Sequence, residues 1–236
     1  MSAQADNLAR ILQRLRRAQT ARPPTVALAA DVALLAVSKT RTAAEVRAMA
    51  ALGQRAYGEN YVQEAVAKQR DLADLDLEWH LIGHLQSNKA REAAVAFDWV
   101  QSVDRIKLVG ALARHRPTDM PPLNVLVQVN IDDEASKSGC HPCDVRVVAD
   151  AITAEPRLVL RGLMAIPAAV PETERRHAAF RALKSLFDDL RNAHARQNPQ
   201  SRVDTLSMGM SEDFELAIAE GATLVRIGTA LFGARR

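Results

Sequence analysis

Short apolar segments rich in β-branched residues alternate with longer segments of helical spacing along the whole chain, and this alternation constrains the fold most. The apolar segments have the length and composition of strands buried on both faces. Strands that alternate with helices form a parallel sheet covered by helices on both faces. The expected strands are Ala33–Thr40, Arg55–Glu59, Trp79–His84, Trp99–Val103, Leu123–Asn130, Leu158–Ile166, Thr205–Met210 and Leu224–Thr229.

Eight strand and helix units within 236 residues predict an α/β fold, a closed (β/α)8 or TIM barrel. We expect residues 1–236 to form one domain, with an amphipathic helix at about residues 3–20 before the first strand. An open doubly wound sheet is the alternative, but the chain has no Gly-rich GxGxxG turn to support it. No low-complexity linker marks a second domain.

The charge pattern argues against nucleic acid as the main partner, because 31 basic and 28 acidic residues are mixed along the chain and aromatic residues are few. No apolar run reaches the length of a membrane span. The N-terminus is amphipathic and unlike a signal peptide. Two cysteines are too few for a disulfide framework. We therefore expect a cytoplasmic protein that binds neither nucleic acid nor membrane.

Polar residues stand where the expected strands end. The carboxyl ends of barrel strands meet at one mouth, where barrel chemistry takes place. We therefore expect these side chains to converge there. They are Lys39, Asn60, His80, His84, Asn130, the segment 207–211, Arg226, Gly228 and Thr229.

Lys39 ends an apolar strand in a chain that has only six lysines against twenty-five arginines. Burial disfavours the charged form of an amine and lowers its pKa, which makes the amine a nucleophile for carbonyl groups. The alternative is a lysine that extends from the barrel rim into water. The residue by itself leaves both interpretations open.

The segments 207–211 and 226–230 follow the last two strands, where many barrels bind phosphate. Ser211 is expected to be the N-cap of the next helix. Gly209 and Gly228 would let a ligand approach the backbone closely. Ordinary capping and turn chemistry is the alternative. An amine that attacks carbonyls, opposite a phosphate site, suggests a ligand with both a carbonyl and a phosphate group.

Seven motifs follow one another in the order found in a known family. The chain resembles the pyridoxal phosphate homeostasis proteins, which are related in fold to the N-terminal barrel of alanine racemase. The motifs are AVSKT (36–40), YGENYVQE (57–64), WHLIGHLQSNK (79–89), VNIDDEASKSG (129–139), GLMAI (162–166), LSMGMSEDFELAI (206–218) and VRIGTALFG (225–233).

The resemblance implies that Lys39 forms an internal aldimine with pyridoxal 5′-phosphate (PLP), as in PLP proteins of fold type III. Ser211, Gly228 and Thr229 would hold the phosphate, and Arg226 would face the pyridine nitrogen. A guanidinium only donates hydrogen bonds, so it would leave that nitrogen unprotonated. PLP held in this way would be a weak electron sink.

The resemblance also places Asn60 and His80 beside the ring of PLP, with Met208 and Met210 at the border of the pocket. His84 departs from the family, because many relatives have proline at this position. It is expected at the mouth, as a rim residue without a chemical task or as an acid or base.

The expected function is PLP binding and PLP homeostasis without robust catalysis. The chain ends at Arg236, whereas the racemase relatives have a second domain that supplies a catalytic tyrosine. The only tyrosines here are Tyr57 and Tyr61. PLP-dependent apoenzymes are the candidate acceptors of the cofactor, and a monomer is expected.

Two other functions remain open. The first is a racemase-like PLP enzyme of fold type III that acts on an amino acid, with His84 or a water as the second acid or base. The second is an aldolase without cofactor, in which Lys39 would form a Schiff base with a sugar phosphate.

The pair Cys140 and Cys143 has the CxxC spacing of redox and metal sites, with His141 between them. A zinc site usually needs a fourth ligand, and no second CxxC follows. We expect these residues to be structural loop residues.

Two further groups of charged residues have open roles. Glu134 and Lys137 lie on a loop expected over the mouth, as a lid or as a solvated turn. Arg175, Arg176 and Arg181 are expected on the solvated face of a long helix.

Overall fold

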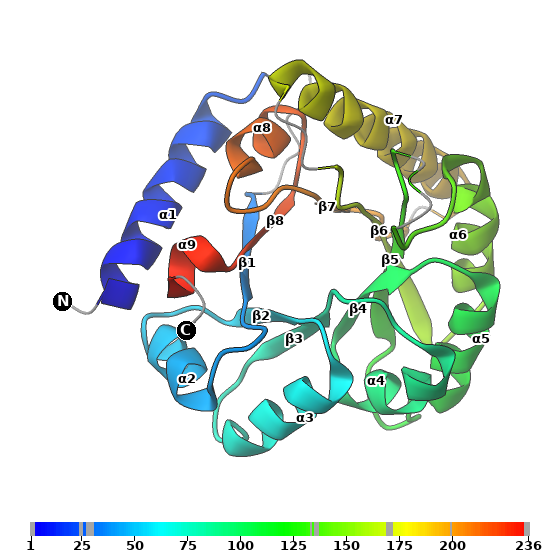
Figure 1. Cartoon of the computed structure of the whole chain (residues 1–236). Coiled ribbons are helices and arrows are strands. Elements are labelled where there is room, and N and C mark those ends of the chain that lie inside the picture. The colour runs from blue at the N-terminus through cyan, green and yellow to red at the C-terminus, as the bar shows by residue number, and fades with distance from the viewer. Residues whose placement is uncertain are drawn as a thin grey trace.

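The computed structural model describes residues 3–23, 26, 31–132, 134, 137–168, 172–198 and 200–233. In it, parallel strands close into a barrel in the order β1-β2-β3-β4-β5-β6-β7-β8, which confirms the TIM barrel and excludes the open sheet (Figure 1). The strands are β1 (Ala33–Val37), β2 (Ala56–Glu59), β3 (Glu78–Leu81), β4 (Trp99–Val103), β5 (Leu123–Gln128), β6 (Leu158–Met164), β7 (Thr205–Ser207) and β8 (Leu224–Ile227).

Most of the expected strands continue beyond the observed ones at their carboxyl ends. β1 ends at Val37 and β7 ends at Ser207, because the chain turns there into the loops of the mouth. Thr40 has φ 64° and Gly209 has φ 90°, a left-handed backbone that turns the chain out of the extended conformation. The apolar pattern predicted the buried part of each strand, whereas the turn into the mouth left no clear signal.

Helices surround the barrel. They are α1 (Ala3–Thr20), α2 (Ala43–Ala51), α3 (Val62–Asp71), α4 (Ala90–Ala96), α5 (Ile106–His115), α6 (Val145–Thr153), α7 (Thr173–Gln197), α8 (Phe214–Ala219) and α9 (Thr229–Phe232), with 3-10 turns at Ser87–Lys89 (η2) and Pro142–Asp144 (η3). In the part of the chain that is described, no helix is both long and apolar enough to cross a membrane.

Helix α1 has the predicted bounds and lies beside α8 and α9 (Figure 1). Its buried face consists of Leu8, Ile11 and Leu15. Polar contacts fix its position, since Arg14 Nε lies 2.6 Å from Glu215 Oε1. The N-terminal helix therefore packs against the elements that follow the last two strands.

Two kinds of core hold the fold together. A large apolar core fills the space between strands and helices, and α7 contributes the predicted face Phe180, Leu183, Phe187 and Leu190. Smaller clusters of buried residues are Leu35, Ile82 and Leu224, and Trp99, Leu126 and Met164. Buried polar side chains accompany them: His80, Gln101, Ser207 and Arg226.

Candidate functional site

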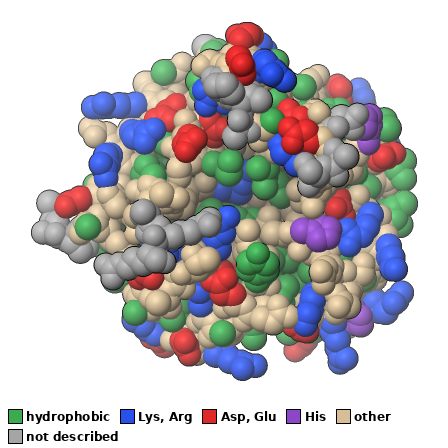
Figure 2. Space-filling view, viewed as in Figure 1, with side chains coloured by type: hydrophobic (Ala, Val, Ile, Leu, Met, Phe, Trp, Pro, Cys, Tyr) green, Lys and Arg blue, Asp and Glu red, His purple; other side chains and the backbone are tan. Residues whose placement is uncertain are grey.

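A cavity of about 660 Å³ lies where the predicted polar residues converge. Its volume is in the range of sites for small molecules. Figure 2 shows basic and hydrophobic side chains around the hollow at the centre of this face. The lining residues are Val37, Lys39, Asn60, Ile82, Ile166, Pro167, Arg176, Met210, Ser211, Glu212, Asp213, Arg226, Gly228 and Thr229. Of the eight residues predicted to bind the cofactor, Lys39, Asn60, Ser211, Arg226, Gly228 and Thr229 line this cavity.

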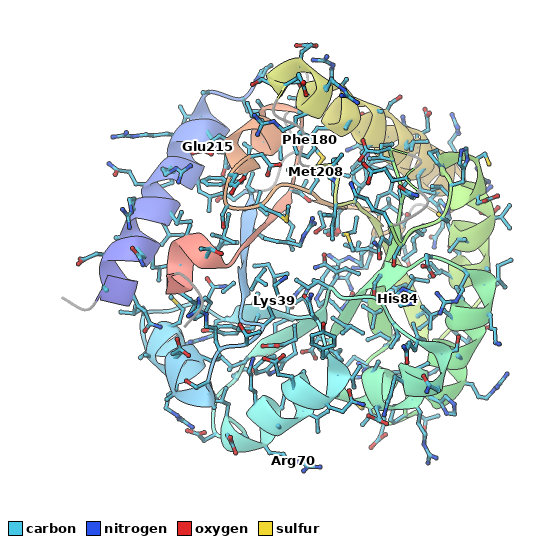
Figure 3. All side chains as sticks on the ribbon, viewed as in Figure 1. Lys39, Arg70, His84, Phe180, Met208 and Glu215 are labelled. Atoms are coloured by element: carbon cyan, nitrogen blue, oxygen red, sulfur yellow. The ribbon has the colours of Figure 1, made fainter. Side chains whose placement is uncertain are left out.

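Lys39 enters the cavity from a tight turn directly after β1 (Figure 3). Its backbone neighbour Ser38 is buried, and Lys39 itself is half-buried. The turn closes with a hydrogen bond of 3.0 Å from the Arg41 N–H to the Ser38 carbonyl. Thr40 adopts φ 64°, which is uncommon for a residue with a side chain. This backbone needs support from its surroundings.

Lys68 of α3 supplies that support from behind the turn. Its ammonium donates to the Ser38 carbonyl at 2.6 Å and to the carboxylates of Glu59 and Glu64 at 2.7 Å each. Glu64 Oε1 also accepts the backbone N–H of Thr40 at 2.5 Å. The two residues that flank Lys39 are thus held by one cluster of charged side chains.

The cluster is largely buried, with side-chain exposures of 7% for Lys68 and 0% for Glu59. Burial raises the pKa of Glu59, while hydrogen bonds from Lys68 and Ser38 lower it in part. The pattern of polar residues at the strand ends does not predict this cluster. The available signal was the spacing of Glu64 and Lys68, one helical turn apart, with Lys68 among only six lysines.

Arg226 of β8 is the buried cation of the cavity wall, and 3% of its surface is exposed. Its Nη1 donates to Ser207 Oγ at 2.7 Å and its Nη2 to the Ala165 carbonyl at 2.8 Å. Burial lowers its pKa to about 10, and the charge of Asp213 opposes that shift. Even so, the guanidinium is charged at neutral pH.

Ser211 lines the cavity but is not the N-cap that we predicted. Helix α8 begins at Phe214 and its N-cap is Asp213. The Asp213 carboxylate accepts the backbone N–H of Met210 at 2.7 Å, which keeps the residues 211–213 in a turn. The hydroxyl of Ser211 is therefore presented by a loop rather than by a helix start.

The two glycines of the expected phosphate site differ in their surroundings. A Cβ on Gly209 would lie 2.5 Å from the Cβ of Ala217, so this glycine lets α8 approach β7. A Cβ on Gly228 would meet the Val37 carbonyl at 3.3 Å. Gly209 thus serves the packing of the chain, whereas Gly228 lines the cavity, and its close approach to a ligand stays a prediction.

His80 and Met208 are not among the residues that line the cavity, so their place beside the cofactor stays a prediction. Both are fully buried. His80 stacks on Trp99, with ring centroids 5.1 Å apart and an angle of 11° between the planes. It also contacts Glu78 and Gln101. Met208, labelled in Figure 3, is part of the large apolar core, whereas Met210 lines the cavity as expected.

His84 is exposed and lies across the mouth from Lys39 (Figure 3). Its Nδ1 lies 3.1 Å from Ser138 Oγ, and it is not among the residues that line the cavity. The geometry favours the rim residue over the acid or base.

Polar contacts join the described residues of the loop after β5. Asn130 Nδ2 donates to the Glu134 carbonyl at 2.8 Å, and Lys137 Nζ lies 3.3 Å from Glu134 Oε2. Neither Glu134 nor Lys137 lines the cavity. The remainder of the expected lid, residues 133, 135 and 136, lies outside the described residues. Lys137 Nζ is shielded from solvent between Asp132 and Glu134, so the described part is not a fully solvated turn, and the role as a lid stays a prediction.

The three arginines of α7 differ in position. Arg175 and Arg181 are exposed, with 72% and 51% of their side chains accessible. Arg176 is half-buried and lines the cavity, which corrects its predicted place on the solvated face. It adds a third cationic side chain to the walls.

Cys140 and Cys143 are in different environments. Cys140 is buried, and its backbone pairs with that of Val129 as an isolated bridge. Burial raises the pKa of its thiol to about 12. Cys143 is exposed, and His141 Nδ1 lies 3.0 Å from its Sγ. Within the described ranges no group of three or more His, Cys, Asp or Glu residues is arranged to hold a metal ion.

The donor set of the cavity fits PLP. Lys39 offers an amine for an aldehyde, and Arg176 and Arg226 offer positive charge for an anion. Ser211 and Thr229 add hydroxyl groups. The apolar side chains of the lining provide walls for a planar ring.

Comparison with known proteins agrees with this geometry. Residues 6–236 match the family described as alanine racemase, N-terminal domain. The chain is 54% identical to the pyridoxal phosphate homeostasis protein of Pseudomonas aeruginosa, over 100% of this chain and 97% of the relative. It is 46% identical to that of Escherichia coli, over 98% of this chain and 96% of the relative.

Solved structures give the same result. PipY of Synechococcus elongatus with PLP bound has a TM-score of 0.77 and 40% identity, over 94% of this chain and 99% of PipY. Alanine racemase of Corynebacterium glutamicum, at 20% identity and a TM-score of 0.66 over 98% of this chain and 62% of the racemase, shares the fold. The chain therefore belongs to the pyridoxal phosphate homeostasis proteins, a family built on the alanine racemase N-terminal domain.

Proposed function

We propose that this chain binds PLP as a Schiff base on Lys39 and acts in PLP homeostasis. The main support for this proposal is that Lys39 and Arg226 line the same cavity as the polar residues after β7 and β8, Ser211 and Thr229. Relatives at 46–54% identity are named for PLP homeostasis, and the PipY structure with PLP bound supports the choice of ligand.

Bound PLP supplies an aldehyde and an electron-withdrawing ring. Lys39 would hold PLP covalently through the aldehyde carbon, with the aldehyde oxygen released as water. The amine must be neutral for this reaction. Ser211 and Thr229, which line the cavity, would orient the phosphate by hydrogen bonds, and the apolar walls would exclude water from the ring.

Arg226 faces the pyridine nitrogen in this proposal. A guanidinium donates a hydrogen bond and keeps its own protons, so it holds that nitrogen in the unprotonated state. Such a site favours holding PLP over strong carbanion chemistry. We therefore propose a carrier without robust catalysis, whose acceptors are PLP-dependent apoenzymes.

We further propose that the carrier is a monomer in the cytoplasm. Two free cysteines suit a reducing compartment. Light scattering during size exclusion tests the oligomeric state, and a stable dimer would contradict it.

Borohydride reduction followed by peptide mapping tests the site. The purified protein with PLP should show a visible absorbance band, and reduction should fix the PLP group on the peptide that contains Lys39. Lys39→Ala should lose both signals, whereas Lys107→Ala, which removes an exposed lysine on α5, should keep both. A protein that gains no band with PLP would instead favour the cofactor-free aldolase.

Deuterium exchange at the Cα of several amino acids separates the carrier from a racemase-like enzyme. A carrier should show slow exchange. Rapid exchange that is lost in Lys39→Ala would contradict the carrier and favour the enzyme.

A further inference from the structure

A continuous chain of hydrogen bonds runs from Arg226 through the barrel. Arg226 Nη1 donates to Ser207 Oγ at 2.7 Å. Ser207 Oγ donates to Gln101 Oε1 at 2.7 Å. Gln101 Nε2 lies 2.9 Å from His80 Nδ1, and His80 Nε2 lies 2.7 Å from Glu78 Oε1.

The chain connects opposite ends of the barrel. Arg226 lines the cavity, and Ser207, Gln101 and His80 are fully buried. Glu78 is the first residue of β3, and 48% of its side chain is exposed. Since the cavity lies at the carboxyl ends of the strands, the carboxylate of Glu78 is at the other mouth.

If every hydrogen bond is donated in the direction from Arg226 to Gln101 and from His80 to Glu78, each donated proton in the chain of hydrogen bonds has an acceptor. An arginine only donates and an ionised glutamate only accepts. The hydrogen bond from His80 is the main cause that lowers the pKa of Glu78, so this carboxylate is ionised at neutral pH. Ser207 accepts from Arg226 and passes its own proton to Gln101 Oε1. His80 is then neutral and carries its proton on Nε2.

The reverse orientation of the Gln101 amide is less favourable. It would place a second N–H donor toward Ser207 Oγ and leave the Ser207 hydroxyl proton without an acceptor in the chain. It would also require a proton on both nitrogens of His80. Hydrogen bonds that all point the same way polarise one another, which strengthens the favoured arrangement.

Arg226 needs such a partner because its charge is buried. Its guanidinium donates to the Ser207 hydroxyl and the Ala165 carbonyl, and the charge of Asp213 also acts on it. A carboxylate in direct contact would balance the charge but would also take two N–H groups of the guanidinium. The neutral hydroxyl of Ser207, polarised toward a distant carboxylate, takes only one N–H group. More of the guanidinium is thereby left for a ligand in the cavity.

We propose that Glu78 is a positioning residue, which orients Arg226 toward the pyridine nitrogen of PLP through His80, Gln101 and Ser207. This proposal rests on the proposed function, since PLP is the ligand that Arg226 would face. The chain of hydrogen bonds is present without the ligand, so its protonation can be measured in the ligand-free protein.

The experiment compares the wild type with Glu78→Gln, Gln101→Leu and a control, Asp204→Asn. Glu78→Gln removes the charge at the end of the chain, and Gln101→Leu interrupts its middle. Asp204 directly precedes β7 and is 51% exposed, and its carboxylate pairs with Arg161, whose charge also acts on Glu78. This control therefore changes the charges around Glu78 but keeps every member of the hydrogen-bond chain. The control thus removes a comparable carboxylate near the same end of the barrel.

The first readout uses the ligand-free protein. Long-range ¹H–¹⁵N NMR of the wild type should show His80 as the neutral ring protonated on Nε2. Asp204→Asn should leave this signal unchanged and Gln101→Leu should alter it. A wild-type His80 with protons on both nitrogens would overturn the proposal.

The second readout is affinity for PLP and for 1-deaza-PLP, which has carbon in place of the ring nitrogen. Glu78→Gln and Gln101→Leu should weaken PLP binding about tenfold, while Asp204→Asn should not. With 1-deaza-PLP the variants and the wild type should bind equally. Equal PLP affinity of Glu78→Gln and the wild type would overturn the proposal, even if Gln101→Leu does not fold.

The two proposals fail in different ways. If the wild type captures no PLP on Lys39, the proposed function is wrong. If the wild type captures PLP and Glu78→Gln binds it normally, only the positioning role is wrong.

Discussion

The carboxylate of Glu64 accepts the backbone N–H of Thr40 at 2.5 Å, directly beside the lysine that lines the cavity. The same oxygen lies 2.7 Å from the ammonium of Lys68. Thr40 keeps a left-handed φ of 64° in this contact. Helix α3 thus supports the backbone that presents Lys39.

Glu64→Ala should therefore weaken PLP binding and lower the free energy of unfolding by about 1–2 kcal/mol, because it leaves the Thr40 N–H without its acceptor. Glu64→Gln keeps an acceptor oxygen and should restore most of the binding. The matched control is Glu92→Ala, since Glu92 is also an acidic residue in a first helical turn and is exposed. Absorbance titration with PLP and urea unfolding provide the measurements; a Glu64→Ala variant that resembles the control would contradict this role.

Lys68→Met should destabilise the protein by about 3–5 kcal/mol, because it leaves the buried Glu59 carboxylate without a cation. Glu59→Gln keeps an acceptor for Ser38 and Lys68 and should cost less. In the double variant the loss should be smaller than the sum of the single losses. Urea unfolding of all four proteins measures this coupling, and strictly additive losses would show that the pair does not interact.

Because the pKa of Glu59 is raised, the free energy of unfolding should depend on pH. For a carboxyl group whose pKa is higher in the folded state, the stabilising contribution is fully present below the unfolded pKa. It is lost as the pH rises through the folded pKa. The stability of the wild type relative to Glu59→Gln should therefore decrease from acidic toward neutral pH. Unfolding free energies at several pH values test this, and a constant or increasing difference would show that the pKa is not raised.

Gly83→Ala should reduce PLP binding by displacing Asn60 in the cavity wall. A Cβ on Gly83 would lie 2.2 Å from the Asn60 carbonyl oxygen and 2.7 Å from its Cα, so the backbone of one loop must move. Gly110→Ala is the matched control, because Gly110 lies within α5 and its Cβ would meet nothing within 4 Å. The control should gain about 0.5–1 kcal/mol in stability and bind PLP normally. Normal binding by a folded Gly83→Ala variant would argue against a role for Asn60.

A thiol reagent should modify one cysteine of the native protein at neutral pH and both after unfolding. Burial raises the pKa of Cys140 to about 12, so its thiolate is scarce, whereas Cys143 is exposed. Colorimetric thiol counting measures the number, and Cys143→Ser should reduce the native count to zero. Rapid modification of Cys140 in that variant would show that the loop opens readily.

The sequence by itself determined the barrel and half of the residues that line the cavity. Buried strands such as Trp99–Val103 were predicted correctly, because strands covered on both faces require continuous apolar segments. Lys39 and Arg226 were identified from their places at strand ends, since a parallel barrel brings all such ends to one mouth. Local pattern and topology were sufficient for these features.

Only the tertiary structure decided the contacts between elements. The structure places His80 in a chain of hydrogen bonds inside the barrel, although it was expected at the cavity. It places Arg176 in the cavity wall, although it was expected on the solvated face. Lys68 of α3 donates a hydrogen bond to the Ser38 carbonyl, in the turn that presents Lys39. The direction of a side chain and its partner depend on packing between segments distant in sequence, which no local periodicity records.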